Sequence, residues 1–151
     1  MDITLSTTVT KARERIATIG KHTPTKDGSS VFIPVTSSSA EGTVLTDFSE
    51  EAAHKVISSI SHFMRSVRLS SGHLIAQPVL VADEDILQYE IERYIVHYIV
   101  AKWLMTYSPT MAQPYTEEAS KMLQAIRMYV HYRPAPIPSE YDYSDIKEIE
   151  P

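Results

Sequence analysis

Apolar residues recur at every third or fourth position in four stretches of the chain, and this spacing predicts four helices. The longer stretches cover residues 48–69 and 84–107, and the shorter ones cover residues 7–19 and 116–131. Asp47, followed by Glu50, predicts a capped start for the second helix, and Asp83 predicts one for the third. Gly20 is placed to end the first helix.

The predicted helix over residues 84–107 is the unusual one, because its last three turns are apolar on nearly all sides. A helix of this kind is normally surrounded by other elements, so we expect it to be the central helix of the protein. If the chain supplies too few partners, a neighbouring subunit must cover the rest. An elbow over residues 108–115 follows, and Pro134 ends the last helix.

The remaining segments are turn-rich or tail-like. Residues 21–46 read as an irregular loop or a short β-hairpin near residues 30–46, inserted into a single helical domain that covers residues 1–133. Residues 79–81 are either a short strand or a buried loop. The predicted fold class is therefore mainly α: a small helical bundle with one long central helix and an extended acidic C-terminal tail over residues 134–151.

The composition excludes several kinds of site. The chain has 151 residues with four glycines and no cysteine, so disulfides, cysteine-based zinc sites, thiol nucleophiles and glycine-rich phosphate loops are not expected. The N-terminus does not resemble a signal peptide, and the longest apolar run is too short to span a membrane. Residues 134–151 hold one basic and five acidic residues, so they carry −4 of the net −5, and the body carries −1. A nearly neutral body argues against strong nonspecific binding to duplex DNA.

Glu51 and His54 have the spacing of a carboxylate–histidine pair in a di-iron bundle, but no second pair of this kind occurs. His97 stands alone in its helix, where a hydrogen-bonded structural histidine is expected. No nucleophile motif is present. We therefore predict a protein without enzymatic activity, with no catalytic, metal-binding or cofactor-binding residues.

The nine tyrosines are better explained by protein contacts than by stacking on nucleic acid, because acidic residues accompany those in the long helix. The candidate residues for a subunit interface are Tyr89, Tyr94, Tyr98, Trp103, Tyr107, Tyr129, Tyr132 and Arg133. The tail alternates acidic and apolar residues, and it could dock as a strand on another surface. Its candidate docking residues are Tyr141, Tyr143, Ile146 and Ile149.

Four segments together resemble a known family: DFSEEAAHKV (47–56), EIERYIVHYIVAKWL (90–104), EASKMLQAIR (118–127) and YRP (132–134). An amphipathic helix, a long apolar helix, an elbow and a further amphipathic helix are similar to the plan of the head–tail connector, adaptor or neck-ring proteins of tailed bacteriophages. The likeness is closest to the neck proteins of phages that infect Bacteroides-type hosts. It covers residues 47–134, and the Ser/Thr-rich N-terminal region departs from the plan.

The resemblance implies a structural virion protein, made in the host cytoplasm and located in the neck or tail region. Its subunits would form a ring, commonly twelvefold, that joins the portal to the tail and neck proteins. Genomic DNA would pass through the central channel without sequence-specific binding, and no membrane would be involved. The alternative is a small non-enzymatic adaptor or regulatory protein that binds one partner through its acidic, tyrosine-rich tail.

Overall fold

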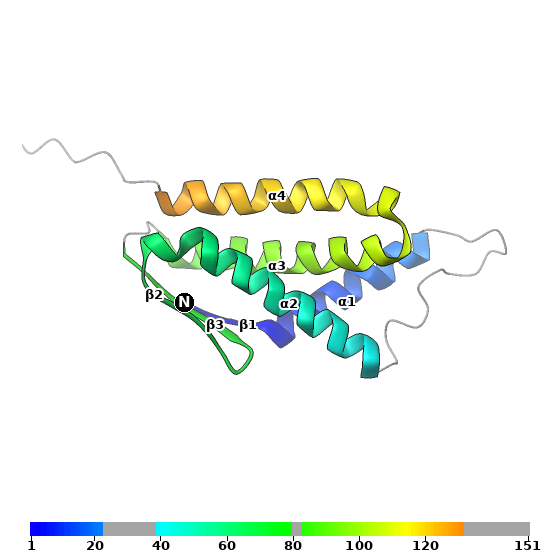
Figure 1. Ribbon diagram of the computed structural model, residues 1–151, viewed down its shortest axis with the longest axis horizontal. Helices are drawn as coiled ribbons and strands as arrows, with labels where there is room; N and C mark the ends of the chain where they lie inside the picture. Colours follow the sequence, from blue (N-terminus) through cyan, green and yellow to red (C-terminus); the bar gives the residue numbers. More distant parts are fainter. Residues whose placement is uncertain (23–38, 80–82, 132–151) are drawn as a thin grey trace, which may run out of the picture.

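The computed structural model describes residues 1–22, 39–79 and 83–131, with side chains described for all of these except 21, 22 and 39–41. These residues form a four-helix bundle with a small antiparallel sheet at one end (Figure 1). The elements are β1 (Asp2–Thr4), α1 (Leu5–His22), α2 (Ser39–Ile60), the short 3₁₀ helix η2 (Ser61–Phe63), β2 (Met64–Ser70), β3 (His73–Pro78), α3 (Glu84–Tyr107) and α4 (Pro109–His131). The mainly helical fold class is confirmed.

Helix α3 is the central element of the fold, as its sequence predicts. It packs against α1, α2, α4 and β1 (Figure 1). Its buried side chains therefore lie on all sides of the helix: Leu87, Ile91, Tyr94, Ile95, Val96, Tyr98, Ile99, Val100, Ala101, Trp103 and Leu104. The chain itself supplies this cover, and the large apolar side chains of α3 that stay exposed are Ile86, Tyr89, Met105 and Tyr107.

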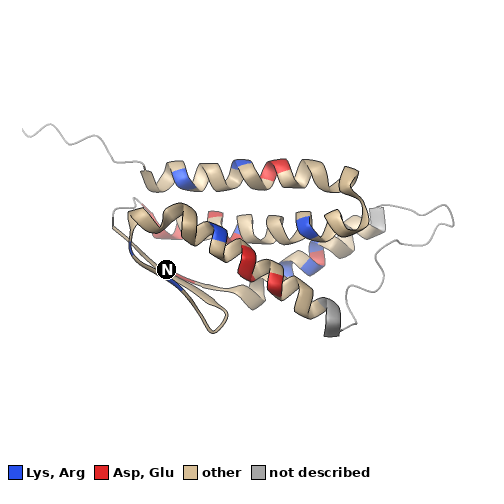
Figure 2. Ribbon diagram, viewed as in Figure 1, with Lys and Arg blue, Asp and Glu red and all other residues tan. Residues whose placement is uncertain are grey.

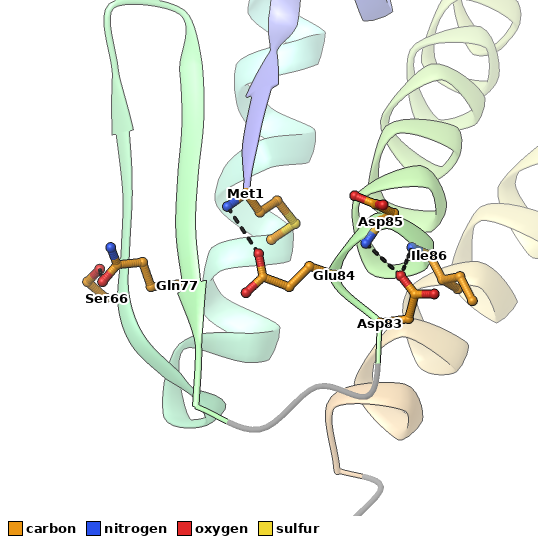
Figure 3. Close-up of polar contacts among 7 residues, drawn as sticks. All are labelled: Met1, Ser66, Gln77, Asp83, Glu84, Asp85 and Ile86. Atoms are coloured by element: carbon orange, nitrogen blue, oxygen red, sulfur yellow. Dashed lines mark hydrogen bonds and ion pairs between the residues drawn. The ribbon is translucent and has the colours of Figure 1, made fainter.

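The start of α3 is capped as expected. The Asp83 side chain accepts hydrogen bonds from the backbone N–H groups of Asp85 and Ile86, at 3.0 and 3.2 Å (Figure 3). These bonds satisfy two of the donors that every helix leaves free in its first turn. The N-terminal amine of Met1 also lies 3.6 Å from the Glu84 carboxylate, which connects β1 to the same turn.

The elbow predicted over residues 108–115 is wrong, because Ser108 alone separates α3 from α4. The Ser108 N–H donates to the Leu104 carbonyl at 2.7 Å and ends α3, while its hydroxyl accepts from the Met111 N–H at 3.4 Å and begins α4. Pro109 fits the first position of α4, where no N–H is needed. Pro114 lies inside the helix and removes one hydrogen bond without ending it.

Helix α2 differs from the prediction at both of its ends. It begins at Ser39, so the predicted hairpin near residues 30–46 is wrong for residues 39–46, and residues 30–38 lie outside the described part of the chain. The physical reason is Leu45, which is fully buried and extends the helical stripe formed by Ala52 and Val56. Asp47 is therefore an exposed residue within the helix rather than its cap.

Helix α2 also ends at Ile60, nine residues before the predicted end at Leu69. The chain then enters β2, which forms a hairpin with β3 through the register Val67↔Ala76 and Leu69↔Leu74. Residues four positions apart lie on the same face of a strand, and they also lie on the same face of a helix. The apolar spacing of this stretch therefore fits both structures, and pairing with β3 decides for the strand.

The hairpin turn is formed by Ser71 and Gly72, with φ angles of 50° and 78°. Two successive positive φ angles match the twist of the flanking strands, and glycine adopts this conformation readily. Strand β1 pairs with β3 on the other side, which gives the sheet order β1-β3-β2. Ile3, Leu74 and Ala76 are buried in the core, while β2 keeps most of its side chains at the surface.

Two smaller expectations also have outcomes. Gly20 does not end the first helix, because α1 continues to His22. No helix among the described residues is long and apolar enough to cross a membrane. The predicted tail, residues 134–151, lies outside the described part of the chain.

Candidate subunit-contact surfaces

The tyrosines and the tryptophan proposed for an interface do not share one surface. Tyr94, Tyr98 and Trp103 are buried against the chain's own elements, with Tyr94 and Tyr98 rings 5.9 Å apart. Tyr89 and Tyr107 are 62% and 50% exposed, at opposite ends of α3. Tyr89 and Tyr107 therefore present the most surface to a neighbouring subunit, whereas Tyr94, Tyr98 and Trp103 pack mainly within the chain.

The remaining candidates lie near the end of α4 or beyond it. The Tyr129 hydroxyl donates to the Asp83 carbonyl at 3.3 Å, which ties the end of α4 to the start of α3. Tyr129 is half-buried, so its role in the fold is intramolecular. Tyr132 and Arg133 lie outside the described residues, as do the tail residues Tyr141, Tyr143, Ile146 and Ile149.

One groove runs between α1 and α3, with a volume of about 500 Å³. We call it the α1–α3 groove. Its lining includes the exposed Tyr89, the buried Val96 and Val100, and His97. Its charged residues are mixed: Lys11 pairs with Glu92 at 3.2 Å, and Arg15 and Arg93 lie nearby. The full lining is Lys11, Glu14, Arg15, Thr18, Ile19, Tyr89, Glu92, Arg93, Val96, His97, Val100 and Tyr115.

His97 is the least satisfied polar side chain of this groove. Its ring lies 5.4 Å from the Tyr115 ring, and its Nε2 atom is buried without a hydrogen-bond partner among the described residues. The hydrogen-bonded histidine expected from the sequence is therefore not what the structure shows. Burial lowers the pKa of His97, and the nearby Arg15 guanidinium lowers it further.

A second groove, of about 340 Å³, lies where α3 meets α2 and α4. We call it the α3–α4 groove. Met105, 45% exposed, is one of its lining residues, together with Leu123 of α4. Its full lining is Lys55, Tyr94, Tyr98, Ala101, Lys102, Met105, Thr116, Ala119, Ser120 and Leu123.

The α3–α4 groove is bounded on the α2 side by a polar cluster. The Tyr98 hydroxyl donates to Glu51 at 2.5 Å, and Lys102 pairs with the same carboxylate at 3.2 Å. The Lys55 and Lys102 ammonium groups lie 5.5 and 5.6 Å from the centre of the Tyr98 ring, within cation–π range. The electron-rich ring of Tyr98 therefore contacts two cations.

This cluster accounts for three pKa shifts. The hydrogen bond from Tyr98 lowers the pKa of Glu51, and Lys102 adds to the effect, while burial opposes it. Burial and the Glu51 charge raise the pKa of Tyr98, and they raise that of Tyr94 to about 12. Glu51 is thus bound by a phenol and an ammonium group. No group of three or more potential metal ligands occurs among the described residues.

The two grooves lie on nearly opposite sides of α3. At 3.6 residues per turn, the α3 residues of the α1–α3 groove and those of the α3–α4 groove are centred roughly 150° apart around the helix axis. Each groove includes an exposed apolar side chain of α3, Tyr89 in one and Met105 in the other. The protein therefore has two different concave surfaces that face in different directions.

The apolar pattern did not indicate that Met105 is exposed, because Met105 belongs to the apolar end of the long helix. The polar cluster was also missed, because Glu51 and Tyr98 are 47 residues apart in the chain. Figure 2 shows basic and acidic residues interspersed along α2, α3 and α4 rather than gathered in one strongly charged face.

Comparison with known proteins finds no matching family model, no similar curated protein and no similar solved structure.

Proposed function

We propose that this chain is the subunit of a ring-shaped head–tail connector in the neck of a tailed bacteriophage. The observation that carries the proposal is the pair of different grooves on nearly opposite sides of α3. Each subunit of a ring contacts its two neighbours through two different surfaces, one for each neighbour. A protein with a single contact patch would instead form a closed dimer.

Three further features support the same function. The described helices pack tightly around α3, which gives a rigid subunit. The polar cluster beside the α3–α4 groove connects α2 to α3 through the hydrogen bond between Glu51 and Tyr98. The body is nearly neutral, which suits a channel through which DNA must slide without being held.

In this mechanism the protein acts mechanically. The groove residues Tyr89 and Met105 face the two neighbours in the ring, and side chains of these neighbours fill the grooves. The ring stacks on the portal and passes the genome through its centre. The tail and neck proteins bind the opposite side of the ring.

The proposal is tested by measuring the mass of the purified chain across a concentration series, followed by negative-stain microscopy. Twelve copies of a 17.0 kDa chain would give a ring of about 200 kDa. A second measurement mixes the chain with a portal ring and looks for co-migration. A chain that stays monomeric at every concentration and does not bind a portal would rule out a connector and favour the adaptor alternative.

A further inference from the structure

Strand β2 lies at the edge of the sheet formed by the described residues. The sheet order β1-β3-β2 places β2 at one side, where no other described strand pairs with it. It is seven residues long, and only Met64 of these residues is buried. An exposed edge of this length presents unpaired backbone groups to a further strand.

The backbone groups at this edge can be assigned from the hydrogen bonds on the far side of β3. The Ala76 N–H donates to the Met1 carbonyl at 3.1 Å, and the Leu5 N–H donates to the Gly72 carbonyl at 2.9 Å. Backbone groups alternate between the two edges of a strand, so the even-numbered residues of β3 face β1. The odd-numbered residues of β3 therefore face β2.

The partners of these odd-numbered residues on β2 are Ser66, Arg68 and Ser70. Their backbone groups are therefore used within the sheet. Val67 and Leu69 consequently point their N–H and C=O groups at the outer edge. Their side chains are half-buried and face the bundle, whereas those of Ser66, Arg68 and Ser70 are exposed on the other face.

The exposed face of β2 is also basic. Arg65 and Arg68 are exposed, and neither forms an ion pair with any described residue. A strand that fits this edge therefore needs apolar side chains on one face, acidic side chains on the other, and free backbone N–H groups opposite Val67 and Leu69.

We propose that β2 binds the C-terminal segment 139–144 of a second copy of this chain as an antiparallel strand. In the register Tyr141↔Leu69 and Tyr143↔Val67, both tyrosines lie on the face of the half-buried residues. Asp142 then lies directly opposite Arg68 on the exposed face. A slip by one residue would place the acidic side chains against Val67 and Leu69, which fixes the choice of face.

A segment from the same chain fits less well. The His131 ring lies 3.8 Å from the Phe63 ring, so the chain leaves α4 at the Met64 end of β2. At about 3.3 Å per residue, a strand continuing from there along β2 would place the proline-rich residues 133–139 beside it. The acidic segment would lie beyond Ser70. To run antiparallel to β2, a segment of the same chain would first have to pass along the whole length of the edge, roughly 20 Å, and then turn back. The tyrosines would lie in that turn instead of beside Val67 and Leu69.

The proposal deepens the ring assembly under "Proposed function", on which it rests, by naming the tail of one subunit and the β2 edge of the next as a contact. Pro138 fits this arrangement. Its missing N–H would lie on the outer side of the added strand, where no partner is needed. Further strand addition would be hindered there.

Disulfide crosslinking tests the contact, because the chain has no cysteine of its own. One full-length variant carries Ser66→Cys on β2, next to Gln77 of β3 (Figure 3), and a second carries Ser144→Cys in the tail. In the proposed register these residues are a non-hydrogen-bonded pair, whose Cα separation suits a disulfide. The two variants are mixed in a glutathione buffer, and mass spectrometry identifies the mixed disulfide.

The control is a chain that carries Ser58→Cys, since Ser58 is exposed on α2. We expect Ser144→Cys to form a disulfide with Ser66→Cys at least tenfold faster than with this control. Arg68→Glu should slow it roughly fivefold, because the opposed pair becomes a like-charged one, whereas Arg127→Glu on α4 should not. Equal rates for Ser66→Cys and Ser58→Cys would overturn the proposal. A double variant Ser66→Cys/Ser144→Cys that forms its disulfide within single chains would also overturn the proposal.

Amide hydrogen exchange gives a second readout that needs no cysteine. The Val67 and Leu69 amides should gain protection as the full-length chain is concentrated, while the Arg68 amide, already bonded to β3, should change little. Rings without this protection and without the crosslink would refute the tail contact and leave the connector function standing. The crosslink in a protein that forms no ring and binds no portal would refute the connector function alone.

Discussion

The phenol of Tyr98 donates a hydrogen bond to the Glu51 carboxylate and so joins the middle of α3 to α2. The acceptor is an ionised carboxylate, which also pairs with Lys102, so the hydrogen bond from Tyr98 is charge-assisted. Glu51 is half-exposed, and this lowers the contribution of the contact below that of a fully buried pair.

We therefore expect Tyr98→Phe to lower the free energy of unfolding by about 1 kcal/mol. Urea denaturation of the purified chain measures it. Tyr89→Phe is the matched control, since the Tyr89 side chain is mostly exposed, and it should change the stability by less than about 0.5 kcal/mol. Equal effects of the two substitutions would mean that the Glu51 contact contributes nothing.

Tyr94 and Tyr98 should resist ionisation at high pH for as long as the protein stays folded. The raised pKa values of Tyr94 and Tyr98 mean that folding favours their neutral forms. Their contribution to stability is complete below pH 10, the ordinary tyrosine pKa, and is lost as the pH rises through the folded-state values. Absorbance at 295 nm should show these two tyrosines ionising only as the protein unfolds. In Tyr94→Phe, less absorbance should appear in the late step; an unchanged late step would contradict the assignment.

The cap of α3 gives a contrast between two aspartates. Asp83→Ala should cost about 1 kcal/mol, because two N–H groups lose their acceptor. Asp47→Ala should cost less than about 0.5 kcal/mol, because Asp47 is exposed within α2. Thermal denaturation of both variants separates them. The opposite order would restore the start of α2 that the sequence predicted at Asp47.

These aspartates also show what the sequence could and could not predict. Asp83 stands directly before a strong helical pattern, so the start of α3 was predictable. Asp47 has the same local signal, but the burial of Leu45, two residues earlier, continues the helix through it. Tertiary contacts decide such cases, and local sequence does not contain them.

The β2–β3 hairpin illustrates the same limit. Residues 64–70 fit both helical and strand spacing, and the Ser71-Gly72 turn was the one local sign of a hairpin. The burial of three candidate interface residues has a related reason. Periodicity marked Tyr94, Tyr98 and Trp103 as excess apolar surface, but it could not count how many elements would surround α3.

His97 should make the protein less stable in mild acid. Its pKa in the folded protein is below the ordinary value of 6.5, because burial and Arg15 disfavour the charged ring. Its contribution to stability is therefore complete above pH 6.5 and is lost as the pH falls through the folded-state pKa. His97→Gln should reduce the fall in Tm between pH 7.5 and pH 5, roughly the range over which histidine titrates. His54→Gln, on an exposed residue, should leave that fall unchanged; equal slopes in all three proteins would exclude His97 as the cause.

Leu104 and Met105 are neighbours on α3 that separate folding from assembly. Leu104 is fully buried, so Leu104→Ala should cost about 2–5 kcal/mol and reduce assembly through loss of the fold. Met105 lies in the α3–α4 groove and is exposed, so Met105→Glu should leave the Tm nearly unchanged while it removes an apolar contact from the proposed interface and adds a charge. Tyr89→Glu should act in the same way at the α1–α3 groove. Circular dichroism should find both chains folded, and light scattering should find them smaller than the parent assembly. Because a ring uses both surfaces, a mixture of the two variants should form dimers through the one intact pair of surfaces and go no further. Full-sized rings from Met105→Glu and Tyr89→Glu would place the subunit contacts elsewhere on the protein.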